Sequence, residues 1–262
     1  MIFYFSGLGN TRYAAEFISD MLDETLSFIP HTSASETRFK GESLGFLFPV
    51  YSWGVPPLVI DFINHLSDEF IDKVKRRNTP VWTVMTCGDE TGKAPEMLAD
   101  LLRRRGLELS AAWSVIMPNT YVLLPGFNVD NNKTETAKLD AVGPRLLEIG
   151  ERIRKKQWII DVHHGSMAGF KTGVLFPIFK KWGIYPKRWH WTQECIECGK
   201  CAKSCPVGNI TMIGSHPKWG NKCISCLACY HNCPTHAVEY GGITEHKGQY
   251  VCPLHVYHQK KG

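Results

Sequence analysis

The sequence contains no apolar run of the roughly 18–20 residues that a transmembrane helix requires. Its first five residues are apolar, but no basic segment precedes them and Gly7 follows almost at once, unlike a secretory signal peptide. With 44% apolar and 21% charged residues, the composition is that of an ordinary globular protein, and 262 residues suffice for about two domains. We therefore expect neither a transmembrane segment nor an export signal.

Acidic residues are scarce in the second part of the chain. Residues 161–262 contain 5 Asp and Glu against 12 Lys and Arg, whereas residues 1–160 contain 20 against 18. A basic half is typical of proteins that bind nucleic acid. A basic excess is also expected where the protein binds anionic groups, because their negative charge offsets that of the lysines and arginines. The cysteines of this part favour the second interpretation.

Eight of the ten cysteines lie in two copies of the pattern C-x2-C-x2-C-x3-C-P, which begin at Cys195 and Cys223, 28 residues apart. This spacing is the signature of a bacterial ferredoxin with two [4Fe–4S] clusters. Three closely spaced cysteines hold one cluster, and the fourth, before proline, ligates the other. The predicted ligands are Cys195, Cys198, Cys201 and Cys233 for the first cluster, and Cys223, Cys226, Cys229 and Cys205 for the second.

Zinc ribbons also use C-x2-C pairs around one tetrahedral ion, but two four-cysteine runs that both end in proline are better explained by clusters. Clusters with thiolate ligands are anionic and offset much of the basic excess, so no nucleic-acid partner is predicted. Clustered C-x2-C spacing without an export signal also argues against a secreted disulfide protein. We expect a cytoplasmic protein of an anaerobic or microaerobic cell, in which Cys87 and Cys252 are buried or incidental thiols.

Short apolar runs alternate with amphipathic segments over the first 160 residues. The predicted strands are 1–5, 25–29, 44–50, 80–86 and 111–117, and the predicted helices are 11–23, 56–66, 92–105 and 134–156. This alternation predicts right-handed βαβ units and a parallel sheet covered on both faces. Five such strands match the doubly wound order 2-1-3-4-5.

The first predicted strand ends in Ser6-Gly7-Leu8-Gly9-Asn10-Thr11, directly before a helix. Two glycines, two hydroxyls and the N–H groups of a helix start can bind a phosphate, although a tight strand-to-helix turn has the same composition. The dinucleotide fingerprint G-x-G-x-x-G is absent because position 12 is not glycine. Residues 2–18 are similar to the flavodoxin signature for the FMN phosphate, with Leu8 where many flavodoxins have threonine. The resemblance implies FMN rather than NAD or FAD.

The same resemblance implies that loops after the third and fourth strands cover the flavin ring. Tyr51 and Trp53 are the candidate stacking residues, and the loop at 86–92 could face the pyrimidine edge. Residues 117–121, after the fifth strand, could also line the site. The predicted FMN-binding residues are Ser6, Gly7, Leu8, Gly9, Asn10, Thr11, Pro49, Val50, Tyr51, Ser52, Trp53, Gly54, Thr86, Cys87, Gly88, Asp89 and Gly92.

An aromatic and basic connector joins the two cofactor regions. We predict a helix over 168–182 with Val174, Leu175, Ile178 and Phe179 facing inward, which would pack the domains together. Docking of a redox partner and association with a membrane surface are the alternatives. The predicted domains are 1–160 (flavodoxin-like, FMN-binding), 161–192 (connector), 193–242 (ferredoxin) and 243–262 (a polar tail, mobile near its end).

Taken together, the chain resembles the flavodoxin–ferredoxin fusion family. The expected fold is a doubly wound five-stranded α/β sheet of order 2-1-3-4-5, followed by a small α+β ferredoxin-like domain. The resemblance implies an electron-transfer protein that relays single electrons between two [4Fe–4S] clusters and FMN and serves a redox partner protein. The alternatives are a flavin-dependent reductase of a small acceptor, such as a quinone or nitro compound, and a redox sensor with structural clusters. No residue is predicted to act as a catalytic acid or base.

Overall fold

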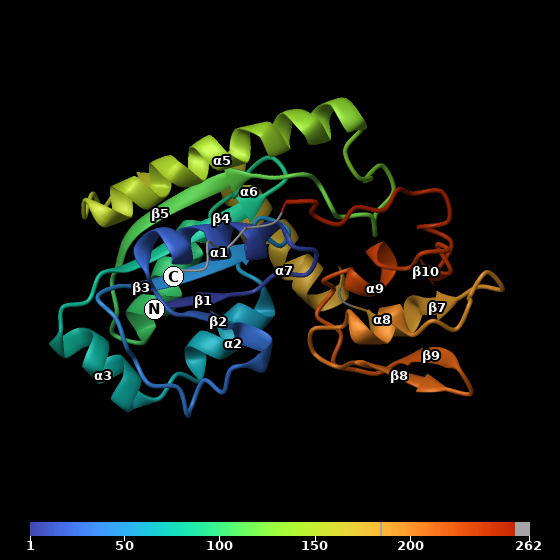
Figure 1. Cartoon of the computed structure of the whole chain (residues 1–262), viewed down its shortest axis with the longest axis horizontal. Coiled ribbons are helices and arrows are strands. Elements are labelled where there is room, and N and C mark those ends of the chain that lie inside the picture. Colours follow the sequence, from blue (N-terminus) through green and yellow to red (C-terminus); the bar gives the residue numbers. More distant parts are fainter. Residues whose placement is uncertain (184, 255–262) are drawn as a thin grey trace, which may run out of the picture.

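A computed structural model describes residues 1–183 and 185–254. Figure 1 shows two parts side by side, an α/β part built on one sheet and a smaller part that holds α8, α9 and β7–β10. The sheet has six parallel strands in the order β2-β1-β3-β4-β5-β6. Its strands are β1 (Ile2–Tyr4), β2 (Leu26–Phe28), β3 (Leu44–Pro49), β4 (Val81–Cys87), β5 (Leu109–Ile116) and β6 (Ile160–Asp161).

The first five strands keep the order expected of a flavodoxin-like sheet, but the predicted count of five is wrong. The sixth strand, β6, follows the last helix of this part and pairs with Ala112 and Trp113 of β5. It has only two residues and lies at the edge, with Ile160 exposed, so it lacks the apolar run that marks the inner strands. The domain boundary predicted at residue 160 therefore falls inside a strand.

Helices cover both faces of the sheet. The side chains of α1 (Asn10–Leu22) and α5 (Asn132–Arg154) form one apolar layer with the sheet. The opposite layer is built by α2 (Pro57–Asn64), α3 (Asp68–Arg76) and α4 (Ala94–Arg104). Burial on both faces explains why β3 and β4 are almost continuously apolar. The five predicted strands and four predicted helices begin and end within two residues of the observed elements.

Helix α3 was not predicted, although the sequence carries its signals. The Ser67 hydroxyl accepts a hydrogen bond from the Phe70 N–H at 3.2 Å, which caps the helix. Acidic residues occupy the first turn and basic residues the last, as the helix dipole favours. A nine-residue helix between two predicted elements offers too short a periodic pattern to be distinguished from a loop.

The cysteine-rich module is an internal repeat in structure as well as in sequence. Its elements are η4 (Pro186–Arg188, a 3-10 turn), β7 (Trp189–Trp191), α8 (Lys200–Lys203), β8 (Ile210–Ile213), β9 (His216–Trp219), α9 (Ala228–His231) and β10 (Val238–Tyr240). Gly199 and Leu227 precede α8 and α9, and both have left-handed backbones, with φ of 67° and 62°. Strand β7 pairs with β10, so the module begins before residue 193 and overlaps the predicted connector.

A continuous helix forms the connector. It runs through α6 (Ala168–Phe170), the π-helical η2 (Lys171–Leu175), α7 (Phe176–Ile178) and the π-helical η3 (Phe179–Gly183). The predicted inward face is partly wrong, because Val174 and Ile178 are exposed and Phe176 is the buried residue. The ring of Phe176 lies directly over Gly54, whose missing side chain leaves room for it.

The segment that follows the module packs against both parts of the protein. Tyr250 and Cys252 are buried in the apolar layer of α1 and α5. The Cys252 N–H donates to the Leu8 carbonyl at 2.9 Å, and the Tyr250 hydroxyl donates to Asn10 Oδ1 at 2.6 Å. The predicted tail is therefore docked at least to residue 254, and residues 255–262 lie outside the described part. No helix within the described residues is long and apolar enough to cross a membrane.

Candidate functional site

The structure brings the four predicted ligands of the first cluster together. Cys195, Cys198, Cys201 and Cys233 line one small cavity of about 20 Å³ inside the module. Burial raises the pKa of the Cys201 thiol, and the charges of the other three cysteines raise it further. Cys198 is exposed at the molecular surface, so this set of sulfur atoms faces solvent on one side.

The predicted ligands of the second cluster also lie close enough to influence one another. Burial raises the pKa of the Cys226 thiol to about 12, and the charges of Cys205 and Cys223 add to the shift. Cys229 is affected in the same way by all three of its companions. Thiols in such a place become thiolates only with a compensating cation, because coordination by a metal deprotonates a thiol outright. The donor set therefore fits an iron–sulfur cluster.

Backbone hydrogen bonds to sulfur repeat at equivalent positions of the two motifs. The Asn209 N–H donates to Cys205 Sγ at 3.2 Å, and 28 residues later the Ala237 N–H donates to Cys233 Sγ at 3.2 Å. These cysteines are the ones before proline that are predicted to cross to the other cluster. Hydrogen bonds to the sulfur ligands orient them and tune a cluster's potential. Within the described residues, no three His, Cys, Asp or Glu side chains are arranged to hold a single metal ion.

The loop between β1 and α1 has the geometry of an anion site. Gly9 adopts φ of 100°, which favours glycine, and its N–H donates to the Ser6 hydroxyl at 3.1 Å. The first turn of α1 leaves N–H groups without intrahelical acceptors, and the helix dipole favours a negative charge there. Thr11 does not offer a free hydroxyl, because it is buried and shares a 2.7 Å hydrogen bond with Thr86. The backbone donors fit a phosphate.

The strand-end loops meet at a cavity of about 120 Å³ beside this anion site. Its aromatic lining consists of Tyr51 and Tyr121, and Phe179 of the connector helix lies edge-on to both rings, with centroids 6.2 and 6.1 Å away. Cofactor pockets usually measure roughly 300–1,000 Å³. The lining has the aromatic cover that a flavin ring needs, but the loops must open to admit one. The cavity is lined by Ser6, Gly7, Leu8, Asn10, Thr11, Pro49, Val50, Tyr51, Thr86, Cys87, Gly88, Met117, Pro118, Asn119, Thr120, Tyr121 and Cys226.

Six residues predicted to bind FMN do not line this cavity, namely Gly9, Ser52, Trp53, Gly54, Asp89 and Gly92. Three of them, Trp53, Gly54 and Gly92, contact the connector helix instead. The Trp53 Nε1–H donates to Glu90 at 2.7 Å, and the Thr172 hydroxyl donates to the Trp53 carbonyl at 2.7 Å. A side chain at Gly92 would collide with Trp53 and Thr172. Sequence reasoning missed this competing use because the connector lies far away along the chain.

Cys226 connects the candidate flavin cavity to the second cysteine set. It lines the cavity, and its carbonyl oxygen lies only 2.6 Å from where a Cβ on Gly7 would stand. Tyr51 shows the same proximity, since burial raises the pKa of its hydroxyl and the charges of Cys226 and Cys223 add to the shift. A predicted cluster ligand therefore touches the loop that is predicted to hold the flavin phosphate. Nothing in the cysteine spacing could have indicated this contact.

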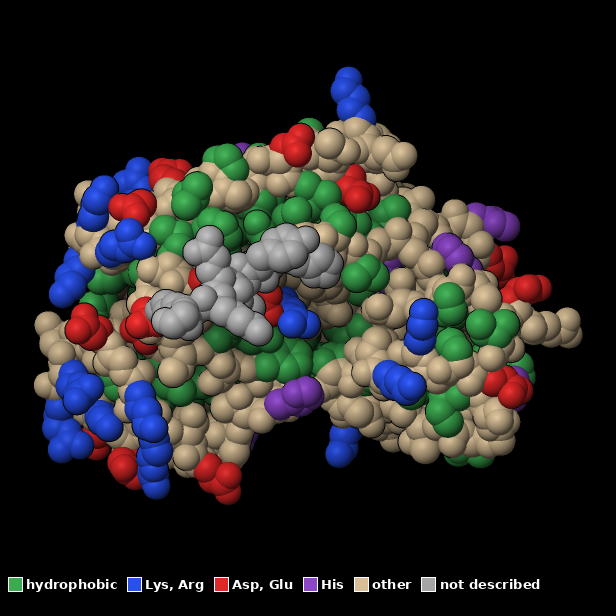
Figure 2. Space-filling model, viewed as in Figure 1, with side chains coloured by type: hydrophobic (Ala, Val, Ile, Leu, Met, Phe, Trp, Pro, Cys, Tyr) green, Lys and Arg blue, Asp and Glu red, His purple; other side chains and the backbone are tan. Residues whose placement is uncertain are grey.

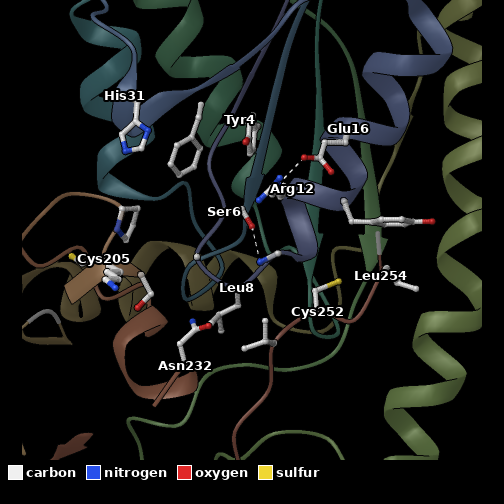
Figure 3. Close-up of a pocket in the computed structure, with 18 residues that line it drawn as sticks. Tyr4, Ser6, Leu8, Arg12, Glu16, His31, Cys205, Asn232, Cys252 and Leu254 are labelled. Carbon is white, nitrogen blue, oxygen red and sulfur yellow. Dashed lines mark hydrogen bonds and ion pairs between the residues drawn. The ribbon is translucent and has the colours of Figure 1, made fainter. Parts of the chain in front are cut away.

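A second cavity, of about 800 Å³, lies on the other side of the same loop (Figure 3). Figure 3 shows Tyr4 and His31 on one side of it, with Cys205 and Asn232 opposite. The rings of Tyr4 and His31 contact Phe28 between them, with centroids 5.1 and 5.0 Å apart. The cavity therefore offers an aromatic wall facing a predicted ligand of the second cluster. Its basic side chains are Arg12 and Lys203.

His231 fastens the module to both neighbouring segments. The Tyr250 N–H donates to its Nδ1 at 3.0 Å, so Nε2 carries the proton that is shared with the Thr120 carbonyl at 2.8 Å. Burial lowers the pKa of His231 to about 4, which keeps the ring neutral near pH 7. The two lone cysteines are separate from the cluster sites. Burial raises the pKa of Cys87 to about 12, and Cys252 packs against Gly9.

Comparison with known proteins places the cysteine-rich part in a family but leaves the remainder unassigned. Residues 194–238 match the family of 4Fe-4S dicluster domains. No curated protein matches the chain.

Several solved structures show weak likeness to the chain. Rubredoxin oxygen:oxidoreductase from the anaerobe Desulfovibrio gigas is 14% identical over 56% of this chain, with a TM-score of 0.36, and the chain spans only 35% of its length. A putative flavoprotein from Bacteroides uniformis is 17% identical over 44% of this chain and 88% of its own, with a TM-score of 0.33. The Trp repressor binding protein from Bacillus subtilis is 15% identical over 56% of this chain and 97% of its own, with a TM-score of 0.35. The fold assignment rests on strand order rather than on these likenesses.

Proposed function

We propose that this protein transfers electrons between two [4Fe–4S] clusters and an FMN and exchanges them with a redox partner protein. The observation that carries the proposal is the position of Cys226. This predicted ligand of the second cluster forms part of the wall of the cavity where the phosphate loop and the strand-end loops meet. A 4Fe-4S domain and a flavodoxin-type sheet are thus joined at the edge where open α/β sheets bind their ligands.

The two cysteine sets have different surroundings, and these suggest a direction through the protein. Cys198 of the first set is exposed, whereas Cys226 of the second set is only partly exposed and lies against Gly7 and near Tyr51. We infer that the partner protein approaches the first set and that the second set adjoins the flavin. Clusters exchange single electrons and a flavin one or two. The protein's own contribution is to hold the sulfur atoms, donate N–H groups to them and exclude water.

The proposal is tested by anaerobic purification followed by iron, sulfide and flavin analysis and a spectroscopic redox titration. We expect iron and sulfide for two clusters, one FMN, and reversible reduction of both kinds of centre. Zinc in place of iron, without flavin, would overturn the proposal. Iron and sulfide without flavin would support a ferredoxin but overturn the proposal that the protein binds FMN. Irreversible loss of iron on reduction and reoxidation would indicate structural or sensing clusters instead.

The large cavity favours a second candidate function, a reductase of a small flat acceptor such as a quinone or nitro compound. Its volume of about 800 Å³ lies within the usual range for ligand sites, and Cys205 borders it opposite the aromatic wall of Tyr4 and Phe28. The test is turnover of the anaerobically reduced protein with quinones and nitroaromatics. Saturable turnover that is lost in Phe28→Ala supports the reductase. Reaction with a protein acceptor alone excludes it.

A further inference from the structure

Four large apolar side chains project from the outer face of the connector helix. We call Phe170, Val174, Ile178 and Trp182 the connector ridge. Their exposed fractions are 50%, 43%, 46% and 64%. Soluble proteins expose single apolar residues routinely, but a continuous row of large ones marks an interaction site. The ridge takes no part in the cysteine sites or in either of the two larger cavities.

The π-helical turns align these side chains. The ridge residues are four positions apart, a spacing that drifts around a regular α-helix of 3.6 residues per turn. The segments η2 and η3 are wider helices with i→i+5 hydrogen bonds, and they offset this drift. Such turns are rare and are frequent at functional sites. The ridge is consequently a straight row along one face.

The opposite face of the helix is fixed to the α/β part, so the ridge cannot turn inward. Phe176 is buried over Gly54, Lys171 forms an ion pair with Glu90, and Thr172 accepts a 2.8 Å hydrogen bond from the Lys93 N–H. Burying the ridge would require breaking all three contacts. Exposure of the ridge is therefore built into the way the helix docks.

The connector segment itself carries charge of one sign. Residues 162–193 contain five Lys and Arg and no Asp or Glu. Lys180, Lys181 and Lys187 are exposed, and none of them forms an ion pair within the described part of the chain. In contrast, red and blue side chains alternate along the rim of the α/β part in Figure 2. The three unpaired lysines beside the ridge are complementary to a negatively charged surface.

We propose that the connector ridge docks on an anionic lipid surface. A helix that lies in a membrane interface combines aromatic and aliphatic residues on one face with flanking lysines, and tryptophan favours the headgroup level. The Lys181 ammonium lies 4.8 Å from the centre of the Trp182 ring, which keeps the cation beside the aromatic anchor. A projecting row of side chains fits a deformable lipid layer better than it fits a protein pocket. A second copy of the chain would bring the unpaired lysines of two ridges together.

Vesicle co-sedimentation of the intact, cluster-loaded protein tests the proposal. We expect binding to phosphatidylcholine vesicles that contain phosphatidylserine, little binding to phosphatidylcholine alone, and weakening by salt. Lys180→Gln with Lys181→Gln should lower the partition roughly thirtyfold, at about a fivefold loss per lysine. Trp182→Ser should lower it roughly tenfold. The matched controls are Arg76→Gln with Arg77→Gln at the C-terminal end of α3 and Leu147→Ser on α5, both exposed sites that should leave the partition unchanged.

The proposal is overturned if neutral and anionic vesicles bind equally, or if ridge and control variants partition alike. It is also overturned if light scattering shows a dimer that Trp182→Ser dissociates, because the ridge would then be an interface between copies. An acidic protein that binds the ridge when anionic vesicles do not would likewise replace lipid as the occupant. The absorbance of the clusters and circular dichroism of each variant show that the fold is retained. None of these outcomes depends on where electrons flow.

Discussion

Gly7→Ala is expected to weaken the contact between the phosphate loop and the second cysteine set. A Cβ at this position would stand 2.6 Å from the Cys226 carbonyl oxygen and 3.0 Å from its Cβ. Both atoms belong to a residue that is itself fixed in the module, so neither can move aside as the end of a flexible side chain could. Overpacking of this kind costs about 1–3 kcal/mol. At roughly 2–4 °C per kcal/mol for a domain of this size, the thermal midpoint should fall by about 2–12 °C.

The measurement is thermal unfolding under anaerobic conditions, followed by cluster absorbance, in cluster-loaded protein from which flavin has been removed. Removing flavin separates the packing contact from any effect of Gly7 on phosphate binding. Gly173→Ala is the matched control, because nothing lies within 4 Å of its added Cβ. Ala in a helix is favoured over Gly by about 0.5–1 kcal/mol, so the control should unfold at the same or a slightly higher temperature.

If Gly7→Ala unfolds at the temperature of the unchanged protein while flavin is absent, the close packing of Gly7 against Cys226 does not contribute to stability. A second readout is the rate of electron transfer between the clusters and re-added FMN, measured by flash photolysis. We expect this rate to fall in Gly7→Ala and to be unchanged in Gly173→Ala. A normal rate in a destabilised variant would show that Cys226 does not lie on the route to the flavin.

Four further changes test other parts of the structure. Phe176→Ala should destabilise the protein by about 3–5 kcal/mol in denaturant unfolding, whereas the exposed neighbour Ile178→Ala should change it by no more than about 0.5 kcal/mol, and equal effects would contradict the helix orientation. His231→Phe leaves the buried Tyr250 N–H unpaired at about 1–3 kcal/mol and removes the partner of the partly buried Thr120 carbonyl, so the amide of Tyr250 should exchange faster with deuterium, and unchanged protection would count against this bridge. Cys205→Ser should remove about half of the iron, whereas Cys87→Ser should remove none, and equal losses would disprove the ligand assignment. Chelation of iron should unfold the module but preserve the far-ultraviolet dichroism of the six-stranded sheet, and a single cooperative loss of both would show that the parts do not fold separately.

The predictable features were those set by short-range spacing. The two cysteine motifs placed Cys195 with Cys233 and Cys205 with Cys223 across the repeat, and the structure brings both groups together. The apolar runs of the inner strands were equally clear, because burial on both faces leaves no polar alternation. The edge strand at Ile160 has neither signal, and it was missed.

The parts that the sequence did not reveal depend on contacts between distant segments. Trp53 is an aromatic residue at the position expected of a flavin-stacking side chain. In the structure it forms hydrogen bonds with Glu90 and with Thr172 of the connector helix. Leu227 replaces the glycine of the first motif and keeps its left-handed backbone, at a cost of about 1–2 kcal/mol, while its side chain is buried in the module. Local composition cannot show whether a side chain will contact a cofactor or a distant segment of the chain.

The hydrogen bond between Tyr250 and Asn10 joins a segment that is synthesised early to one that is synthesised late. These residues are 240 positions apart, so the loop leaves the ribosome long before its packing partner exists. At about 5–20 residues per second, the interval is roughly 10–50 s. During that time the α/β part can form its sheet, but the segment at Cys252 does not yet cover Leu8 and Gly9. Cofactor loading during synthesis would therefore meet an open loop that the finished chain closes.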